Sequence, residues 1–305
     1  MNVTVKKTTV LSCDGVHRLA GVVYIPDAEP KGIFQVVHGM TEHVGRYEEF
    51  MRYIASEGWI CFGYDHLGHG YTANDDSELG FIAHKNGWDM LCRDVKIFSD
   101  AIRAEYGESL TYVLMGHSMG SFIVRLAAEK YVKPSRLIIM GTGGPNPAAD
   151  PGLALIWLIK LFKGEKHVSQ FLQKVIFGGY NNKFSDNDVP SAWLTNDLQI
   201  RKKYADDKFC KFKFKISAMG DLVRLMKHSN RKAWYKNLDK ELPILVVSGK
   251  DDPVGGFGKG VEKVYSSLKK SGHNVDCHLY EGARHEILND VCRDQLKKDI
   301  LDFIK

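Results

Sequence analysis

One serine lies in a sequence setting that favours nucleophilic catalysis. Ser118 is at the centre of a Gly-x-Ser-x-Gly pattern, between Gly116 and Gly120. The pattern follows the aliphatic run 111–115 and precedes apolar residues at helical spacing, so it predicts a sharp turn from a strand into a helix. In such a turn only glycine fits beside the neighbouring backbone, and the serine hydroxyl is raised clear of the sheet. The pattern therefore predicts that Ser118 is a nucleophile.

A serine hydroxyl needs a positioned base, and His285 is the best candidate among the twelve histidines. It lies just past the last predicted strand and immediately before the final predicted helix. Other histidines fall in an early strand, in the middle of the chain, in a turn or within a strand: His17, His228, His273 and His278. We therefore predict that His285 is the base.

Two adjacent aspartates compete for the role of the acid that orients the histidine. Asp251 and Asp252 follow the aliphatic run 244–247, at the end of a predicted strand. Pro253 biases Asp252 towards an extended backbone, from which its side chain can project into a cleft. Asp251 is better suited to close the turn by bonding to its own backbone. We therefore predict Asp252 as the third member of a catalytic triad.

Acyl transfer also needs N–H donors for the negative charge that develops on the substrate oxygen. The amide of Met119, directly after the nucleophile, is one predicted donor, and the amide of Met40 is the other. Met40 follows Gly39, which permits a sharp turn after a predicted strand. Nearby Glu42, His43 and Arg46 resemble an acid–base set. We expect them instead to form a structural ion-pair network that holds this loop.

These residues require a frame, and the chain supplies alternating strand and helix patterns. Short β-branched and aliphatic runs alternate with helical periodicity, which predicts an α/β fold with a mostly parallel sheet and helices on its faces. The predicted strands are Leu19–Ile25, Ile33–Val37, Trp59–Tyr64, Thr111–Met115, Leu137–Met140, Ile244–Val247 and Val275–Tyr280. Loops at the carboxyl ends of such strands would bring Ser118, Asp252 and His285 together.

The alternation breaks between residues 147 and 232. This stretch holds two apolar helical segments, 153–162 and 171–177, followed by a polar and aromatic region. We interpret it as a lid inserted between two strands; a small second core with no role in the site is the alternative. The predicted organisation is a first core part over 1–146, a cap over 147–232 and a second core part over 233–305.

The composition is that of an ordinary globular protein of 305 residues with a formal net charge of +5. Its lysines are scattered, so nucleic acid is not an expected partner. The six cysteines show no metal-binding spacing, and we expect reduced thiols and no metal site. We see no signal peptide, and the longest apolar run, 153–162, is too short to span a bilayer, so a cytoplasmic location is expected.

Five motifs together resemble the monoglyceride lipase and lysophospholipase family of α/β-hydrolases, also described as serine aminopeptidase-like (S33). They are HGMTEHVGRYEEF (38–50), YDHLGHGYT (64–72), GHSMG (116–120), GKDDPVG (249–255) and GARHEIL (282–288). The resemblance covers nearly the whole chain. It implies an α/β-hydrolase fold, a triad of Ser118, Asp252 and His285, oxyanion donors at Met40 and Met119, and a helical cap between the sixth and seventh core strands. One departure is Thr72, where serine is the commoner residue.

The residues and the resemblance together predict a serine ester hydrolase that works through an acyl-enzyme and needs no cofactor. The apolar segments of the cap favour a single-acyl-chain lipid, such as a monoacylglycerol or a lysophospholipid, and allow weak contact with a membrane. A short-chain or aromatic-ester carboxylesterase would use the same machinery. A peptidase would need carboxylates for a free amino group, and Asp186, Asp188 and Asp197 are available in the cap. A non-catalytic binding protein of this fold is the remaining alternative.

Overall fold

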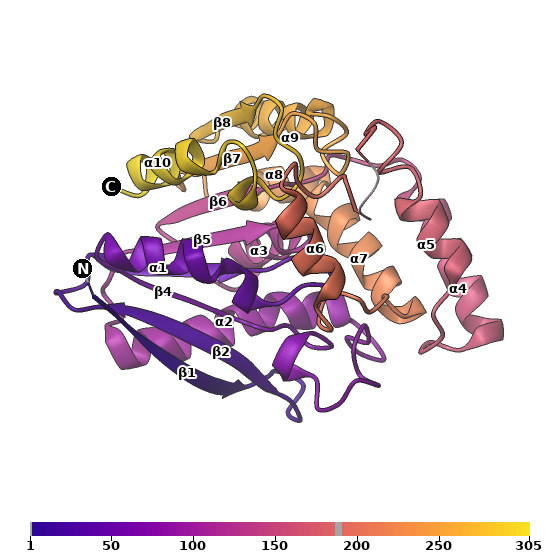
Figure 1. Ribbon diagram of the computed structural model, residues 1–305, viewed down its shortest axis with the longest axis horizontal. Coiled ribbons are helices and arrows are strands. Elements are labelled where there is room, and N and C mark those ends of the chain that lie inside the picture. Colours follow the sequence, from indigo (N-terminus) through magenta and orange to yellow (C-terminus); the bar gives the residue numbers. More distant parts are fainter. Residues whose placement is uncertain (1, 187–190) are drawn as a thin grey trace.

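The computed structural model describes residues 2–186 and 191–305, and within these ranges eight strands form a single sheet (Figure 1). The strand order is β1-β2-β4-β3-β5-β6-β7-β8. The strands are β1 (Val3–Leu11), β2 (Arg18–Pro26), β3 (Gly32–Val37), β4 (Trp59–Tyr64), β5 (Tyr112–His117), β6 (Arg136–Met140), β7 (Ile244–Gly249) and β8 (Val275–Tyr280). β1 and β2 run antiparallel to their neighbours, and the remaining pairs are parallel. The predicted mostly parallel sheet is confirmed.

Helices cover both faces of this sheet (Figure 1). They are α1 (Glu48–Ser56), α2 (Gly87–Tyr106), α3 (Met119–Lys130), α4 (Ala149–Lys163), α5 (Gln170–Phe177), α6 (Leu198–Asp206), α7 (Ile216–Ser229), α8 (Lys232–Asn237), α9 (Lys259–Lys270) and α10 (Arg293–Ile304). Single 3₁₀ turns occur at η1 (Val44–Tyr47), η2 (Gly70–Thr72) and η3 (Ile287–Asn289). α1 and α10 bury their apolar sides against one face of the sheet, and α2, α3 and α9 bury theirs against the other. The strands β3 to β7 are buried between these layers, apart from half-buried Arg136 at the start of β6.

Strand β1 was not among the predicted strands. It pairs with β2 from Val3 opposite Pro26 to Leu11 opposite Arg18, at the edge of the sheet. All of its side chains are exposed or half-buried, so it lacks the continuous apolar run that marks the central strands. Its richness in valine and threonine is the signal that could have revealed it.

The stretch 147–232 leaves the sheet after β6 and returns to it before β7. It holds helices α4 to α7, and we call it the insertion. α7 packs against α3 of the core and against α4. In Figure 1, α4 and α5 lie at the outer edge of the molecule, and α6 lies above the carboxyl ends of the central strands. Within the described part of the chain, no helix is both long and apolar enough to cross a membrane.

Candidate active site

Ser118 lies at the bend between β5 and α3, in a backbone conformation that non-glycine residues rarely adopt. Its φ is 55° and its ψ is −120°. The flanking glycines explain why the bend is possible: a Cβ on Gly116 would lie 2.2 Å from the carbonyl oxygen of Gly120. A Cβ on Gly120 would lie 2.1 Å from the carbonyl oxygen of Val37. The strained serine is held by its N–H, which donates to Met140 O, and it stands at the edge of a cavity.

His285 and Asp252 lie on the loops that follow the carboxyl ends of β8 and β7, and their side chains are in contact. His285 Nδ1 lies 2.9 Å from Asp252 Oδ2, and both side chains are almost completely buried. The carboxylate also accepts the N–H of Val254 at 2.8 Å and the hydroxyl of Ser248 at 3.3 Å. A carboxylate at this position fixes the tautomer with the proton on Nδ1, so Nε2 is free to take a proton. Asp251, the competing aspartate, is exposed.

The structure therefore brings Ser118 and His285 to one cavity, with Asp252 behind the histidine. The other histidines considered from the sequence lie elsewhere: His17 pairs with Asp14 and Glu78, His228 packs on Trp88, His273 contacts Tyr235 O, and His278 contacts Asp299. None of the four lines the cavity with Ser118.

Met40 and Met119, the two predicted oxyanion donors, line the same cavity as Ser118. Met119 is the first residue of α3, so its N–H has no partner within the helix. Met40 follows Gly39, where a Cβ would lie 3.0 Å from the Cβ of Ser118. The loop therefore approaches Ser118 so closely that a side chain at position 39 would be crowded.

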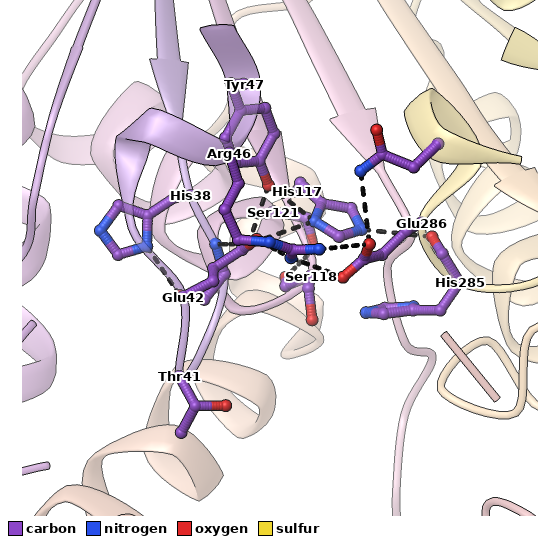
Figure 2. A network of polar contacts seen from close by, with 12 residues as sticks. His38, Thr41, Glu42, Arg46, Tyr47, His117, Ser118, Ser121, His285 and Glu286 are labelled. Carbon is purple, nitrogen blue, oxygen red and sulfur yellow. Dashed lines mark hydrogen bonds and ion pairs between the residues drawn. The ribbon is translucent and has the colours of Figure 1, made fainter. Parts of the chain in front are cut away.

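A buried polar network holds this loop (Figure 2). Glu42 accepts the N–H of Gly39 and the hydroxyl of Tyr47, and Arg46 Nη1 donates to it at 2.9 Å. The same guanidinium makes a bidentate pair with Glu286, at 2.6 and 2.7 Å. The network therefore joins the loop of Met40 to the residue that follows His285. Its residues form the structural ion-pair set expected from the sequence, except that His43 pairs with Asp207.

His117, beside the nucleophile, is the least expected member of the network. The hydroxyl of Tyr47 donates to Glu42, so its oxygen accepts from His117 Nδ1 at 2.8 Å. His117 Nε2 faces the carbonyl oxygen of His285 at 3.2 Å, which can only accept. Both ring nitrogens therefore donate, and the imidazole carries a positive charge. Burial lowers the pKa of His117, but its hydrogen bond to Glu42 and the charge of that carboxylate raise it above 6.5.

Three further histidines lie under the loop and are neutral. His66 Nε2 donates to His38 O at 3.1 Å, and the N–H of Thr41 donates to His69 Nε2 at 3.4 Å. Burial lowers the pKa of His66 to about 3 and that of His69 to about 4. Sequence analysis did not assign this cluster, although the motifs at 38–50 and 64–72 contain it. At Thr72, where the sequence departs from the motif, the hydroxyl donates to Asp65 O at 2.6 Å, a hydrogen bond that a serine hydroxyl could also donate.

The cavity at Ser118 has a volume of about 120 Å³ and is mostly apolar. The insertion supplies much of its wall, from α5, the segment after it, α6 and α7: Ile176, Phe177, Tyr180, Trp193, Leu194, Tyr204, Leu222, Val223 and Met226. Phe122 of α3 closes it from the core side. A larger cavity of about 660 Å³ lies between α4, α7 and the start of α2, but it contains neither Ser118 nor His285. The predicted nucleophile and base therefore both line the smaller, apolar cavity.

One set of side chains in the described residues lies close enough to share a metal ion: His43, Asp207 and Cys210. His43 Nε2 already contacts Asp207 Oδ2 at 2.9 Å. Burial raises the pKa of the Cys210 thiol, which keeps it neutral. The set is thus explained by an ion pair beside a buried thiol.

The candidate carboxylates for an amino group are occupied or not described. Asp186 pairs with Arg201 and Arg284. Asp197 accepts the N–H groups of the first turn of α6. Asp188 lies outside the described residues.

Comparisons with known proteins identify the family of this chain. The family model of serine aminopeptidase, S33, matches residues 28–291. The monoglyceride lipase of Homo sapiens is 32% identical over 267 residues, covering 87% of this chain and 79% of that protein. The monoacylglycerol lipase of Mycolicibacterium smegmatis is 25% identical over 97% of this chain and 98% of its own length.

Among solved structures, a thermostable carboxyl esterase from Bacillus coagulans superimposes with a TM-score of 0.92. It is 29% identical, and the match covers 99% of this chain and 98% of that one. Together with the family match, these similarities show that the chain is an ester hydrolase and that it belongs to the serine aminopeptidase (S33) family of α/β-hydrolases, the group that contains the monoglyceride lipases.

Proposed function

We propose that the protein hydrolyses esters of single-acyl-chain lipids, such as monoacylglycerols or lysophospholipids, through an acyl-enzyme on Ser118. The observation that carries the proposal is the meeting of Ser118 and His285 in an apolar cavity walled by the insertion. An acyl chain bound there would gain about 0.8 kcal/mol for each buried methylene. Residues 147–232 then act as the cap that selects the substrate.

In the proposed mechanism, Ser118 Oγ attacks the ester carbonyl while His285 Nε2 takes its proton. Asp252 stabilises the imidazolium, and the amides of Met40 and Met119 bind the oxyanion. The C–O bond to the alcohol then breaks, and His285 returns the proton to the leaving oxygen. Water, activated by the same histidine, attacks the acyl-enzyme and releases the carboxylic acid. Every step uses groups of the chain itself and water, so no cofactor or metal takes part.

A fluorophosphonate probe and the Ser118→Ala variant test the chemistry. Labelling at Ser118 and loss of ester hydrolysis in the variant are expected. Labelling at another residue, or full activity of Ser118→Ala on p-nitrophenyl butyrate, would refute the assignment. Absence of both labelling and activity in the wild type would favour a binding protein of this fold.

The alternative function is that of a short-chain or aromatic-ester carboxylesterase. The modest cavity volume, about 120 Å³, and the similarity to a carboxyl esterase favour it. Initial rates on monoacylglycerols and lysophospholipids from C4 to C18 distinguish the two. A rise of kcat/KM up to at least C10 supports the lipid hydrolase, and a maximum at C4 supports the carboxylesterase. A peptidase is disfavoured because Asp186 and Asp197 are already engaged.

We further propose that the outer face of α4 and α5 contacts membranes weakly. Six large apolar side chains are exposed on these two helices, including Phe162 at 75%: Trp157, Leu158, Leu161, Phe162, Phe171 and Val175. Exposed lysines accompany them at positions 163 and 174, and they would favour anionic lipid. Sedimentation with phosphatidylcholine vesicles, with and without 20–30% phosphatidylserine (roughly the content of anionic membranes), tests this contact. Binding that Phe162→Asp weakens supports it, and equal recovery of both proteins in the supernatant opposes it.

Residence in the cytoplasm stays a prediction.

A further inference from the structure

A strip of the insertion lies directly on the loop that carries the predicted base. The N–H of His285 donates to Trp193 O at 3.3 Å, and the N–H of Glu286 donates to Leu194 O at 2.7 Å. Two consecutive amides of this loop are therefore satisfied by carbonyls of the insertion. We call residues 191–196 the arm.

Side chains fasten the arm to the loop at both ends. The buried guanidinium of Arg284 donates to Ala192 O at 2.7 Å and pairs with Asp186. At the other end, the hydroxyl of Thr195 donates to Asn289 O at 2.7 Å. These backbone hydrogen bonds, the buried cation and the hydroxyl can be satisfied together in only one alignment of the arm against the loop. The contact therefore fixes the position of the arm relative to His285.

The side chain of Trp193 uses this register to cover the imidazole. Its ring centroid lies 5.0 Å from that of His285, with an angle of 39° between the planes. The backbone N–H of Trp193 donates to Asn181 Oδ1 at 3.0 Å, and the indole ring packs edge-on against Tyr180. His117 also packs on His285, with centroids 4.7 Å apart. Between these rings and Asp252, only 2% of the His285 side chain is exposed.

We propose that Trp193 is a positioning residue for His285, supplied by the insertion to the chemistry of the core. The inference deepens the proposed function and rests on it. His285 must keep Nδ1 on Asp252 while Nε2 exchanges a proton with Ser118. The indole restricts rotation of the ring, excludes water from the Nδ1–H···Asp252 bond, and presents a π face to the imidazolium that forms during the reaction.

The first experiment measures kcat and KM on p-nitrophenyl butyrate, a soluble ester. Its short acyl group fills little of the acyl pocket, so changes in the pocket wall should affect its binding little. Trp193→Ala should lower kcat about 10- to 100-fold, the scale expected when a reacting group is misplaced. KM should change much less. Trp193→Phe keeps an aromatic face and should recover most of kcat, whereas Trp193→Leu, of similar bulk but without a π face, should not.

The second experiment reads the histidine itself. The proton between His285 Nδ1 and Asp252 should give a low-field ¹H NMR resonance that Asp252→Asn removes. In Trp193→Ala and Trp193→Leu this resonance should broaden by exchange with water, and in Trp193→Phe it should persist. A role of Trp193 in stability alone would lower the melting temperature without changing this signal in the folded protein.

Phe177→Ala is the matched control, because Phe177 is an aromatic residue of the insertion in the same cavity. It should raise KM for long-chain esters and leave the resonance unchanged. The proposal is overturned if Trp193→Leu keeps kcat within twofold of the wild type with an unchanged resonance, or if Trp193→Phe loses as much as Trp193→Ala. A wild type without esterase activity would instead overturn the proposed function, and the resonance would still test the contact.

Discussion

Replacement of Arg46 by methionine tests the buried network most directly. The guanidinium is the cation between two carboxylates, Glu42 and Glu286, and the three side chains are only 11%, 5% and 5% exposed. Arg46→Met keeps much of the apolar bulk but leaves Glu286 without its bidentate partner and Glu42 with His117 as its remaining cation. Removing one partner from a buried ion pair costs about 3–5 kcal/mol. For a chain of this size about 2 °C of melting temperature corresponds to 1 kcal/mol, so a fall of about 6–10 °C is expected at pH 7.

The loss should depend on pH with a definite sign. The charge of Arg46 helps to hold the pKa of Glu42 below its usual value, so its removal lets the pKa of that carboxyl rise in the folded variant. The folded variant then binds more protons than the folded wild type, so the stability difference between the two proteins shrinks as pH falls. The difference in melting temperature from the wild type should therefore shrink between pH 7.5 and pH 5. Adding Glu286→Gln to Arg46→Met should restore part of the stability at pH 7.5, because one uncompensated charge is removed.

Arg52→Met is the matched control, since Arg52 pairs with Glu48 at the surface, where the side chains are 47% and 53% exposed. Such a pair contributes about 0–1 kcal/mol. Differential scanning calorimetry of the four proteins from pH 5 to 7.5 provides the measurement. If Arg46→Met loses no more than Arg52→Met, or if its deficit is the same at every pH, the buried carboxylates are not charged as argued.

Three further predictions concern the nucleophile, the acid limit of stability and the acyl pocket. Gly120→Ala should abolish fluorophosphonate labelling and lower the melting temperature, because the new methyl group would lie 2.1 Å from Val37 O; labelling at the wild-type rate would contradict the elbow geometry. His66 and His69, whose pKa values are lowered to about 3 and about 4 by burial, are neutral in the folded protein and protonated in the unfolded chain below about pH 6.5. The stability they contribute is present above pH 6.5 and falls by roughly 1.4 kcal/mol per histidine for each pH unit below it; urea titrations at pH 7, 6 and 5 should show the decline, and a flat profile would refute the neutral cluster. Met226→Trp fills the pocket from α7, so several methylenes of a long acyl chain would be displaced. It should therefore reduce kcat/KM for C12 esters at least about tenfold more than for C4 esters. An equal effect on both esters would mean that the acyl chain binds elsewhere.

The features that can be predicted from the sequence are those whose causes are local. The elbow at Ser118 depends on contacts that forbid a side chain at Gly116 and Gly120, so the residue types themselves record the geometry. The central strands are buried on both faces and therefore form continuous apolar runs. Pro253 distinguishes the two aspartates, because it affects the backbone of the residue before it. In the structure Asp252 is buried and Asp251 is exposed.

The remaining features depend on partners that are far away in the sequence. β1 is an edge strand, so its side chains carry little of the apolar signal. The charge of His117 follows from Tyr47, Glu42 and the carbonyl of His285, and no motif reveals where those atoms meet. The contact between Trp193 and His285 depends on how the insertion folds back over the core, which residue types alone do not determine.

The arm also has a consequence for how this protein can be recombined with its relatives. The insertion leaves the sheet after β6 and returns before β7, which are neighbours, so exchanging it would leave the strand order unchanged. The segment from Ala192 to Thr195, however, is matched bond by bond to the loop around Arg284 and Asn289. Chimeras that inherit both segments from one parent should remain active. Chimeras that take the two segments from different parents would combine surfaces that do not match, and they should lose activity. Among relatives of this chain, these two segments are therefore expected to change together.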